Sequence, residues 1–356
     1  MKIILLGDLH IGIKNGNQTM MNHQKSLFDF VFQYCKDHKI DTIIQLGDQF
    51  DERKKCSYKV LDFAYNAFFD RIEDNKINYY TIIGNHDVFY RETLSITSSD
   101  LLFRKYKYVK IFDQCATLEF DNIKFDLIPW ICNENSRQCF DYIKNSNSDY
   151  CCGHFEINSF PMLGDQLFDQ GIDYKIFEHY DHVWSGHFHN RSRKYNITYI
   201  GTPYPLTWGE ALADKGFYVF DTKTRTTEFI TNNDKYYYYL TYDDSQPNKT
   251  TPIKQLKLTD CFVKVIVAHK SKNTLFNNYI NSIFNCNTAD VKIINQTVID
   301  NHKVDVDDIK TSNTVDLINK YVDNLAIENK SEVLHTLINL YNQSIMIQDD
   351  IDVNVE

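Results

Sequence analysis

The sequence predicts an α/β layered fold in which a parallel sheet with its helices packs against a second sheet. Two observations predict it. Short apolar runs alternate with helical stretches through the first part of the chain, in a β-α-β-α-β rhythm typical of parallel strands. From residue 109 onward the helical stretches thin out and strand-like runs follow one another, which favours a second sheet packed on the first.

The first part of the chain gives five elements. Apolar residues at helical spacing, such as Leu27, Val31 and Cys35, predict an amphipathic helix, whereas apolar runs of about 4–8 residues predict buried strands. The expected order is strand 2–6, helix 24–38, strand 41–46, helix 60–72 and strand 77–83. The carboxyl ends of parallel strands share one edge of a sheet, and ligands bind at that edge in open α/β folds.

The second sheet is predicted from eight short apolar runs. They lie at 109–112, 116–120, 123–128, 149–152, 182–184, 197–200, 216–221 and 226–230. Together with the first sheet they define a first domain at 1–232.

The pattern changes after residue 232. A strand at 235–242 and a polar linker at 243–251 lead into a strand–helix–strand unit, with strands 262–268 and 291–298 and a helix at 273–284, so we expect a small second domain at 233–299. The polar, acidic segment 300–313 is expected to be a flexible tether. Two amphipathic helices follow within 314–346, the second starting near Ser331 as its N-cap, and 347–356 is an acidic tail expected to be disordered.

Composition narrows the class of protein. The chain has 356 residues, 43% of them hydrophobic, enough for about two domains of ~150 residues. The N-terminal apolar run is shorter than the ~7–15 residues of a signal peptide, and no run approaches the ~20 of a membrane span, so a soluble intracellular protein is expected, with no membrane association. The nine cysteines include no CxxC pair and read as reduced thiols. The net charge of −10 argues against a large basic surface, although bound cations or a partner could attract phosphates.

Five short segments carry the chemistry. Each follows a predicted strand, and each places a glycine beside Asp, Asn or His. They are Gly7-Asp8-Leu9-His10, Gly47-Asp48-Gln49-Phe50-Asp51, Gly84-Asn85-His86-Asp87, Gly153-His154 and Gly186-His187-Phe188-His189. Glycine lets the backbone turn sharply and approach a ligand closely.

The spacing within the segments points to metal binding. Asp8 and His10 lie two residues apart, as do His187 and His189, and side chains two apart in an extended segment point the same way. Oxygen ligands mixed with imidazoles suit Mn²⁺, Fe²⁺ or Zn²⁺ better than Ca²⁺. Seven donors exceed one tetrahedral site and fit two cations that share a bridging carboxylate, ~3.5–4 Å apart.

A plainer interpretation exists for each part. A single Gly-Asp or Gly-His pair is common in turns, and Asn85-His86-Asp87 alone could be a turn with a satisfied histidine. The five segments in this order, each after a strand, favour the metal site. The remaining histidines lack this context and are expected to be ordinary surface or core residues: His23, His38, His179, His182, His269, His302 and His335.

In these motifs the chain resembles the calcineurin-like metallophosphoesterase superfamily, whose pattern is DxH, GDxxD, GNHD, GH and GHxH in that order. The resemblance covers residues 1 to about 220 and implies a four-layer α-β-β-α sandwich with two bound divalent cations. It implies that Asp8, His10 and His189 hold one cation, that Asn85, His154 and His187 hold the other, and that Asp48 bridges them. His86 takes the position of the family's acid or charge stabiliser.

Further segments resemble one family within that superfamily. Asp126-Leu127-Ile128-Pro129-Trp130, Tyr199-Ile200-Gly201-Thr202-Pro203 and Gly216-Phe217-Tyr218-Val219-Phe220-Asp221 are similar to the SbcD family of double-strand-break nuclease subunits, above all its phage branch of T-even-type recombination endonuclease subunits. The resemblance implies a Mn²⁺-dependent exonuclease and endonuclease acting on DNA ends, single strands or hairpins. It also implies that 1–232 is the nuclease domain and 233–299 a DNA-binding capping domain. The helices at 314–346 would dock on the coiled coil of an SMC-like ATPase, with the chain a homodimer within a heterotetramer.

One position departs from part of that family. Archaeal and eukaryotic members carry a histidine three residues after the bridging aspartate, where this chain has Asp51. Asp51 is therefore a candidate catalytic residue whose role stays open between proton transfer and orientation of a ligand. Two other functions remain: a phosphatase or small-nucleotide phosphodiesterase on the same fold, and a non-catalytic scaffold, which the complete set of seven donors disfavours.

Overall fold

The structure is a computed structural model that describes residues 1–163, 166–167 and 171–295, together with the single positions 322, 330, 333, 334 and 337. The chain divides into two compact units, Met1–Tyr237 and Tyr238–Glu356. Apart from those single positions, the predicted tether, helix pair and tail lie outside the described residues. The roles predicted for the separate domains stay predictions.

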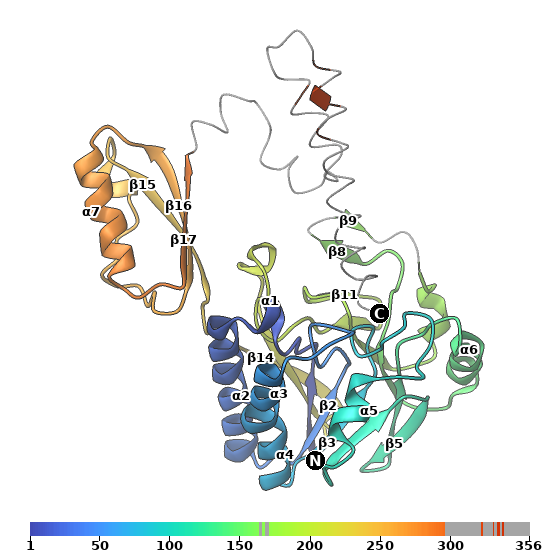
Figure 1. Cartoon of the computed structure of the whole chain (residues 1–356). Helices are drawn as coiled ribbons and strands as arrows, with labels where there is room; N and C mark the ends of the chain where they lie inside the picture. Colours follow the sequence, from blue (N-terminus) through green and yellow to red (C-terminus); the bar gives the residue numbers. More distant parts are fainter. Residues whose placement is uncertain are drawn as a thin grey trace. The chain divides into compact units, whose positions relative to one another are not determined.

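The first unit contains a six-stranded sheet that forms the predicted parallel core (Figure 1). The central strands β1, β2, β3 and β4 run parallel, β13 pairs antiparallel with β1, and β14 pairs antiparallel with β13. In sheet order the strands are β14 (Thr226–Thr231), β13 (Gly216–Asp221), β1 (Lys2–Leu6), β2 (Thr42–Gln45), β3 (Asn78–Ile82) and β4 (Val109–Phe112). The predicted β-α-β-α-β rhythm is confirmed.

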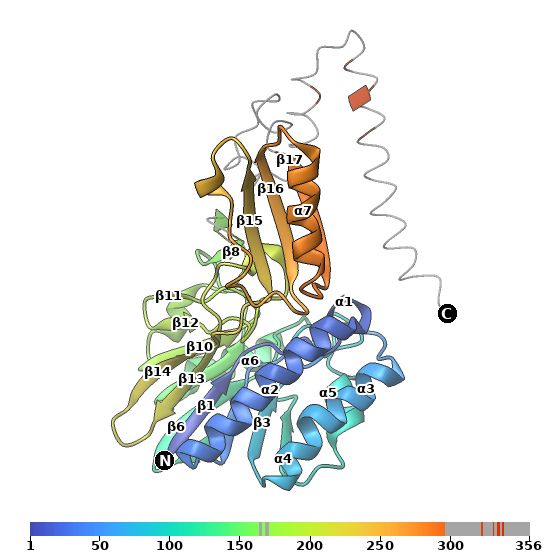
Figure 2. The ribbon, with the colours of Figure 1, turned by 90° about the vertical axis from the view of Figure 1, so that its left-hand side faces the viewer.

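Helices cover one face of this sheet (Figure 2). After the short, irregular α1 (Ile13–Gly16), α2 (Gln18–His38) begins earlier than predicted, because Asn17 caps it by accepting a hydrogen bond from Met20 N at 3.1 Å. The predicted helix at 60–72 is three consecutive elements, α3 (Tyr58–Ala64), the π-helical turn η1 (Tyr65–Phe69) and α4 (Asp70–Asp74). Phe68 of η1 packs edge-on against Tyr79 of β3, with ring centroids 5.4 Å apart.

A second six-stranded sheet packs on the first. Phe125, Cys152 and Trp184 of this sheet share one buried core with Leu5 and Ile44 of the first. In sheet order the strands are β11 (Ser192–Lys194), β12 (Ile197–Tyr199), β10 (His182–Gly186), β7 (Tyr150–His154), β6 (Ile123–Ile128) and β5 (Ala116–Phe120). The prediction of two packed sheets is confirmed, but the assignment of all eight runs to the second sheet was wrong. The runs at 109–112, 216–221 and 226–230 belong to the first sheet as β4, β13 and β14, because they pair with β3, β1 and each other.

Helices are few after residue 109 in the described part of the first unit, as expected, but one of them was not predicted. Helix α6 (Ser136–Asn145) packs on the outer face of the second sheet, where Cys139 and Ile143 share a core with Cys151 and Val183. Its apolar stripe is too narrow to stand out in the sequence. The layers are therefore helix, sheet, sheet and helix, which is the sandwich that the resemblance implied.

Smaller elements complete the first unit. The helix α5 precedes β4, and a two-stranded antiparallel sheet follows β7; neither was predicted. The bounds are α5 (Ser98–Phe103), β8 (Pro161–Leu163), β9 (Gln166–Leu167), η2 (Tyr174–Phe177) and η3 (Trp208–Glu210).

Up to residue 295, the described part of the second unit is a three-stranded sheet on which a helix packs. The strands are β15 (Tyr237–Asp243), which starts at the end of the first unit, β16 (Phe262–His269) and β17 (Asp290–Asn295), in that sheet order. Strands β16 and β17 run parallel, joined by α7 (Asn273–Phe284), whose Phe276 and Ile280 share a core with Val263 and Val265. A short turn η4 (Pro247–Lys249) lies in the predicted linker.

Two further expectations concern the whole chain. All nine cysteines are reduced thiols, as predicted. Among the helices of the described residues, none combines the length and apolar character needed to cross a membrane.

Candidate metal centre

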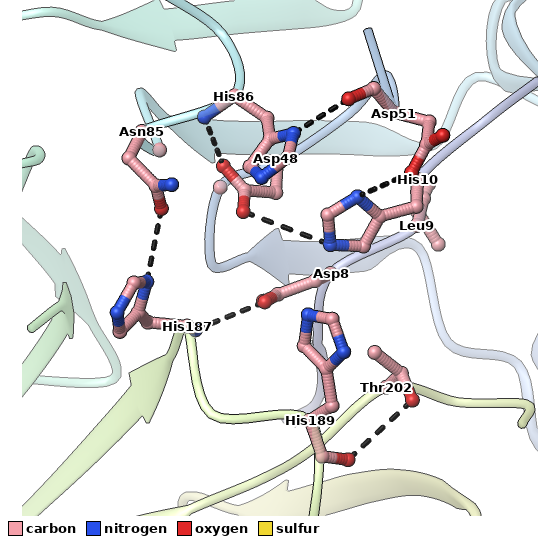
Figure 3. A network of polar contacts seen from close by, with 12 residues as sticks. Asp8, Leu9, His10, Asp48, Asp51, Asn85, His86, His187, His189 and Thr202 are labelled. Atoms are coloured by element: carbon pink, nitrogen blue, oxygen red, sulfur yellow. Dashed lines mark hydrogen bonds and ion pairs between the residues drawn. The ribbon is translucent and has the colours of Figure 1, made fainter. Parts of the chain in front are cut away.

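The five motif segments meet where strands of both sheets end. Asp8 and His10 follow β1, Asp48 follows β2, and Asn85 and His86 follow β3, three neighbouring strands of the first sheet. In the second sheet, His154 is the last residue of β7, and His187 and His189 follow β10, its neighbour. Because the sheets pack face to face, all seven predicted donors converge on one place. Figure 3 labels the donors Asp8, His10, Asp48, Asn85, His187 and His189 there.

One side of this place is formed by Asp8, His10 and His189. One donor atom from each lies within 4.8 Å of the others, and the His10 and His189 rings meet edge-on with centroids 4.9 Å apart. Asp8 and His10 are each only 1% exposed. Within the described part of the chain, Asp8 Oδ1 and both ring nitrogens of His10 have no hydrogen-bond partner. Buried polar atoms are costly without a partner, so this group is suited to a bound cation.

The other side is formed by Asn85, His154 and His187. Asn85 Oδ1 lies 2.8 Å from His154 Nε2 and 2.9 Å from His187 Nδ1. Neighbouring ligand atoms that each lie ~2.1 Å from one ion in octahedral geometry are about 3 Å apart, so this spacing fits a shared cation. His154 Nδ1 lies 2.7 Å from the carbonyl oxygen of Leu46, which can only accept, so Nδ1 carries a hydrogen and Nε2 faces Asn85.

Asp48 lies between the two sides. Its Oδ2 is 3.4 Å from His154 Nε2 and 3.7 Å from His10 Nε2, while its Oδ1 accepts a hydrogen bond from His86 N at 2.7 Å. The residue is 1% exposed and has a left-handed backbone with φ of 57°. This placement is the one required of a bridging carboxylate.

The electrostatics of the site favour bound cations. Burial lowers the pKa of His154, but the Asp48 and Asp8 carboxylates outweigh it and raise that pKa to about 10. Burial also lowers the pKa of His10, but the Asp51, Asp48 and Asp8 carboxylates outweigh burial and raise that pKa to about 8. Burial would raise the pKa of Asp48, but His154, His86 and His10 hold it well below its usual range. A field that stabilises protons on these imidazoles attracts metal cations at the same place.

His86 and Asp51 adjoin the donors. His86 Nδ1 lies 2.5 Å from the backbone oxygen of Asp51, so the ring presents Nε2 to its surroundings, and its centroid is 4.8 Å from that of His10. Burial lowers the pKa of His86. The Asp51 carboxylate lies 3.4 Å from His10 Nδ1, a position from which it can orient that ring.

Asp87 is a functional candidate to which the motif analysis gave no role. Its carboxylate accepts hydrogen bonds from three backbone N–H groups, those of Asp48 at 2.8 Å, Gly84 at 2.9 Å and Gln49 at 2.9 Å. It ties together the turns after β2 and β3. Burial and the neighbouring Asp48 carboxylate raise the pKa of Asp87 to about 7, although the three donors oppose this. Its place in the GNHD motif was the available signal.

Two glutamates that sequence reasoning missed contact the histidines. Glu156 Oε1 lies 3.0 Å from His187 Nε2, and Glu210 Oε1 lies 3.2 Å from His189 Nδ1. Glu210 also forms a buried ion pair with Lys215, Oε2 to Nζ 2.8 Å. Burial would raise the pKa of Glu210, but His189 and Lys215 lower it to about 2. Glu156 stands two residues after His154, the same spacing as in the Asp8/His10 and His187/His189 pairs, so the sequence offered a signal for it, whereas Glu210 lies in no such motif.

An aromatic residue forms one wall of the site. The Trp130 ring lies 5.5 Å from that of His187 and 6.0 Å from that of His154, centroid to centroid. Its backbone N donates to Ile83 O at 2.7 Å, which fixes the loop after β6 against the end of β3. The other histidines in the described residues have partners elsewhere: His23 packs on Tyr236, His38 on Tyr34, His179 on Tyr180, His182 donates to or accepts from Thr198, and His269 contacts Asp244.

The four-layer fold and a carboxylate–imidazole–amide site of this kind define a metal-dependent phosphodiesterase. The family model of the calcineurin-like phosphoesterases matches residues 1–238, and the chain belongs to that family.

Two known proteins are similar to most of the chain. Exonuclease subunit 1 of Enterobacteria phage T4 is 36% identical over 313 residues, which cover 87% of this chain and 90% of that protein. The DNA double-strand break repair protein Mre11 of Nanoarchaeum equitans (strain Kin4-M) is 23% identical over 246 residues, covering 62% of this chain and 66% of that protein. These relatives confirm the resemblance to the SbcD type. A solved structure of an archaeal phosphodiesterase aligns with a TM-score of 0.34 and 15% identity, over 65% of this chain and all of that one.

Proposed function

We propose that this chain is the nuclease subunit of a DNA-end-processing complex and that it hydrolyses phosphodiester bonds with two divalent cations, for which Mn²⁺ is the proposed ion. The convergence of seven donors from five chain segments on one largely buried place carries the proposal. A single structural cation would not require so many donors.

Each proposed cation has its own ligands. Asp8, His10 and His189 would hold one, Asn85, His154 and His187 the other, and Asp48 both. When bound, such a pair supplies Lewis-acid stabilisation of a phosphate and lowers the pKa of a bound water toward neutrality.

His86 would act on the substrate through one ring nitrogen. Because Nδ1 is held by the Asp51 backbone oxygen, Nε2 is the atom that can meet a phosphate or the leaving oxygen. Since Nδ1 already carries a hydrogen, a proton at Nε2 makes the ring an imidazolium, a form that the negative charge of a bound phosphate would favour. That proton would stabilise charge on the phosphate or pass to the leaving oxygen. The Asp51 carboxylate orients His10 in this proposal and need not exchange a proton.

The choice of DNA as substrate is supported by the two relatives, which are named for exonuclease and double-strand-break repair roles. Because the net charge of the chain is −10, the cations and a partner would supply most of the attraction for phosphates. We propose residues 233–299 as a DNA-binding capping domain.

The partner would be an SMC-like coiled-coil ATPase. The apolar stripes within 314–346, among them Leu317, Tyr321, Leu334 and Leu337, are suited to docking on a coiled coil, and the acidic stretch 300–313 gives the reach of a tether. The chain would form a homodimer within a heterotetramer and act inside the cell, in a host cytoplasm if the source is viral.

DNA digestion with Mn²⁺ against Mg²⁺, with and without the co-encoded ATPase, tests the function. Purified chain with Mn²⁺ should degrade linear DNA, and the ATPase should change that activity. Asp48→Asn is the loss-of-metal control. Turnover of bis-nitrophenyl phosphate without DNA cleavage would instead establish a phosphatase or small-nucleotide phosphodiesterase, and a chain that holds no metal by mass spectrometry would be a scaffold.

A further inference from the structure

His187 and His189 leave the end of β10 two residues apart, and each has one ring nitrogen against a glutamate. For His187 that nitrogen is Nε2, 3.0 Å from Glu156 Oε1. For His189 it is the other nitrogen, Nδ1, 3.2 Å from Glu210 Oε1. The two glutamates come from different segments, one just after β7 and one at the end of η3.

The two contacts select opposite tautomers. An ionised carboxylate only accepts hydrogen bonds, so the nitrogen that faces it carries the hydrogen. His187 then keeps its lone pair on Nδ1, and His189 keeps its lone pair on Nε2. His187 Nδ1 is the nitrogen that lies 2.9 Å from Asn85 Oδ1, so its lone pair is directed to the place where Asn85 and His154 also point.

We propose that Glu156 and Glu210 are positioning residues, each fixing the tautomer and ring orientation of one histidine so that His187 offers Nδ1 to one cation and His189 offers Nε2 to the other. The inference rests on the proposed function, because it takes these histidines to be ligands. The geometry of the four side chains is independent of that assumption.

Glu210 and its partner Lys215 together hold both the ring and the backbone of His189. Glu210 Oε2 accepts from Lys215 Nζ at 2.8 Å, from Thr202 Oγ1 at 3.2 Å and from Leu206 N at 3.2 Å. Lys215 Nζ donates in turn to the backbone oxygen of His189 at 2.7 Å. The ring and the backbone of His189 are therefore held by one buried ion pair. Glu210 restrains His189 in a fixed frame.

The Glu156 side is more open. The Glu156 side chain is 41% exposed, against 5% for Glu210. Water can replace part of the hydrogen bonding that Glu156 gives to His187. Loss of Glu156 should therefore weaken cation binding less than loss of the Glu210–Lys215 ion pair. Removal of a residue that orients a metal-binding histidine weakens metal affinity by about 10–100-fold in general. We expect Glu156 at the low end of this range and Glu210 at the high end.

Calorimetric titration of the full chain with Mn²⁺ tests the proposal, with electron paramagnetic resonance to separate paired from single Mn²⁺ ions. The variants are Glu156→Ala and the double variant Glu210→Gln, Lys215→Met, which leaves no unpaired buried charge. Glu119→Ala, exposed on β5, is the matched control. One of the two Mn²⁺ ions should bind about 10-fold more weakly in the first variant and about 100-fold more weakly in the second, with the control unchanged.

A second readout follows the tautomers themselves. In protein labelled with ¹⁵N-histidine, the ring signals of His187 and His189 are assigned with His187→Gln and His189→Gln. Their nitrogen shifts should show Nε2–H for His187 and Nδ1–H for His189. Glu156→Ala should turn the His187 signal into a mixture, which a purely structural contact would not do.

The outcomes distinguish a failure of the proposed function from a failure of the positioning role of Glu156 and Glu210 alone. Wild-type chain that binds no Mn²⁺ overturns the proposed function, and this inference with it, before any variant is tested. Wild type that binds two ions, with both variants within about threefold of its affinity, overturns only the inference. Thermal unfolding checks that each variant is folded. If the double variant does not fold, the Mn²⁺ affinity of the Glu156→Ala variant alone decides the result, since Glu156 is half-exposed.

Discussion

Asp87 holds Asp48 in a backbone conformation that aspartate seldom adopts. Its Oδ2 accepts the Asp48 N–H at 2.8 Å, and Asp48 has φ of 57°. A left-handed conformation costs roughly 1–2 kcal/mol for a residue with a side chain, so it persists only where other contacts stabilise it. The proposed bridging carboxylate therefore depends on a second carboxylate that need not contact a cation.

Asp87→Asn should disturb this arrangement. An amide has one oxygen, whereas Asp87 uses both oxygens to accept from Asp48, Gly84 and Gln49. The amide NH₂ would face a buried N–H, which should cost about 1–3 kcal/mol of folding free energy and weaken Mn²⁺ binding. Urea unfolding and Mn²⁺ content measure the two effects. Asp37→Asn, exposed at the end of α2, is the control; a loss no greater than that of the control would contradict the prediction.

His86→Ala should separate catalysis from metal binding. The seven proposed ligands stay in place, while the ring whose Nε2 would meet the substrate is removed. The rate of DNA cleavage and of bis-nitrophenyl phosphate turnover should fall by about 10²–10⁴-fold with Mn²⁺ content unchanged. His38→Ala, whose ring stacks on Tyr34 at the end of α2, should retain full activity. Robust cleavage by His86→Ala would remove this residue from the mechanism.

The sequence was sufficient for the order of the central strands of the first sheet, because each is a short apolar run between amphipathic stretches. It was weaker at boundaries. The predicted helix began at residue 24, whereas α2 begins at Gln18, where the Asn17 side chain caps it. Gln24, although polar, lies on the buried face of α2 and donates to the His10 carbonyl at 2.9 Å. Helix α6 was missed because only Cys139 and Ile143 of its residues are buried. Tertiary contacts decided both cases.

The sequence predicted the site residues that lie in short local motifs. The donors stand beside glycines directly after strands, so the sequence marks them. Glu210 and Lys215 reach the site through the fold alone: Lys215 is 26 residues from His189, whose carbonyl it contacts. Their residue types and spacing carry no signal, since a lone glutamate is usually a solvated surface residue.

Deletion of residues 312–356 should abolish co-purification with the ATPase partner and spare basal nuclease activity. The apolar stripes proposed to dock on the coiled coil are removed, whereas every proposed ligand lies before residue 190. Deletion of 347–356 alone, the acidic tail, is the matched control and should retain the partner. Pull-down and DNA digestion on the same preparations give both readouts. Retained binding by the longer deletion would refute the docking role.

Gly84→Ala should be far more harmful than Gly209→Ala. A Cβ on Gly84 would overlap the carboxylate and the backbone nitrogen of Asp48, which cannot move without displacing the proposed bridge. A Cβ on Gly209 would meet only Thr207 Oγ1 at 3.7 Å, an ordinary contact. We expect the first variant to lose about 1–3 kcal/mol of stability along with Mn²⁺ binding, and the second to stay within about 0.5 kcal/mol of wild type. Equal effects in both variants would show that Asp48 tolerates displacement.

The metal-free protein should lose part of its stability in acid through Glu210. His189 and Lys215 outweigh burial and lower the pKa of Glu210 from 4.5 to about 2. Because the folded pKa lies below the unfolded one, the contribution is fully present above pH 4.5 and disappears as the pH falls toward 2. The shift corresponds to about 3 kcal/mol at most.

Urea unfolding with EDTA, from about pH 6 to pH 3, can isolate this contribution by comparing wild type with Glu210→Gln, Lys215→Met. Other carboxylates titrate alike in both proteins, so the difference in unfolding free energy reports the ion pair. The advantage of wild type should shrink as the pH falls below about 4.5. A difference that stays constant over this range would mean that the Glu210 pKa is the same in the folded and unfolded chain, and that the buried pair does not depend on the charge of Glu210.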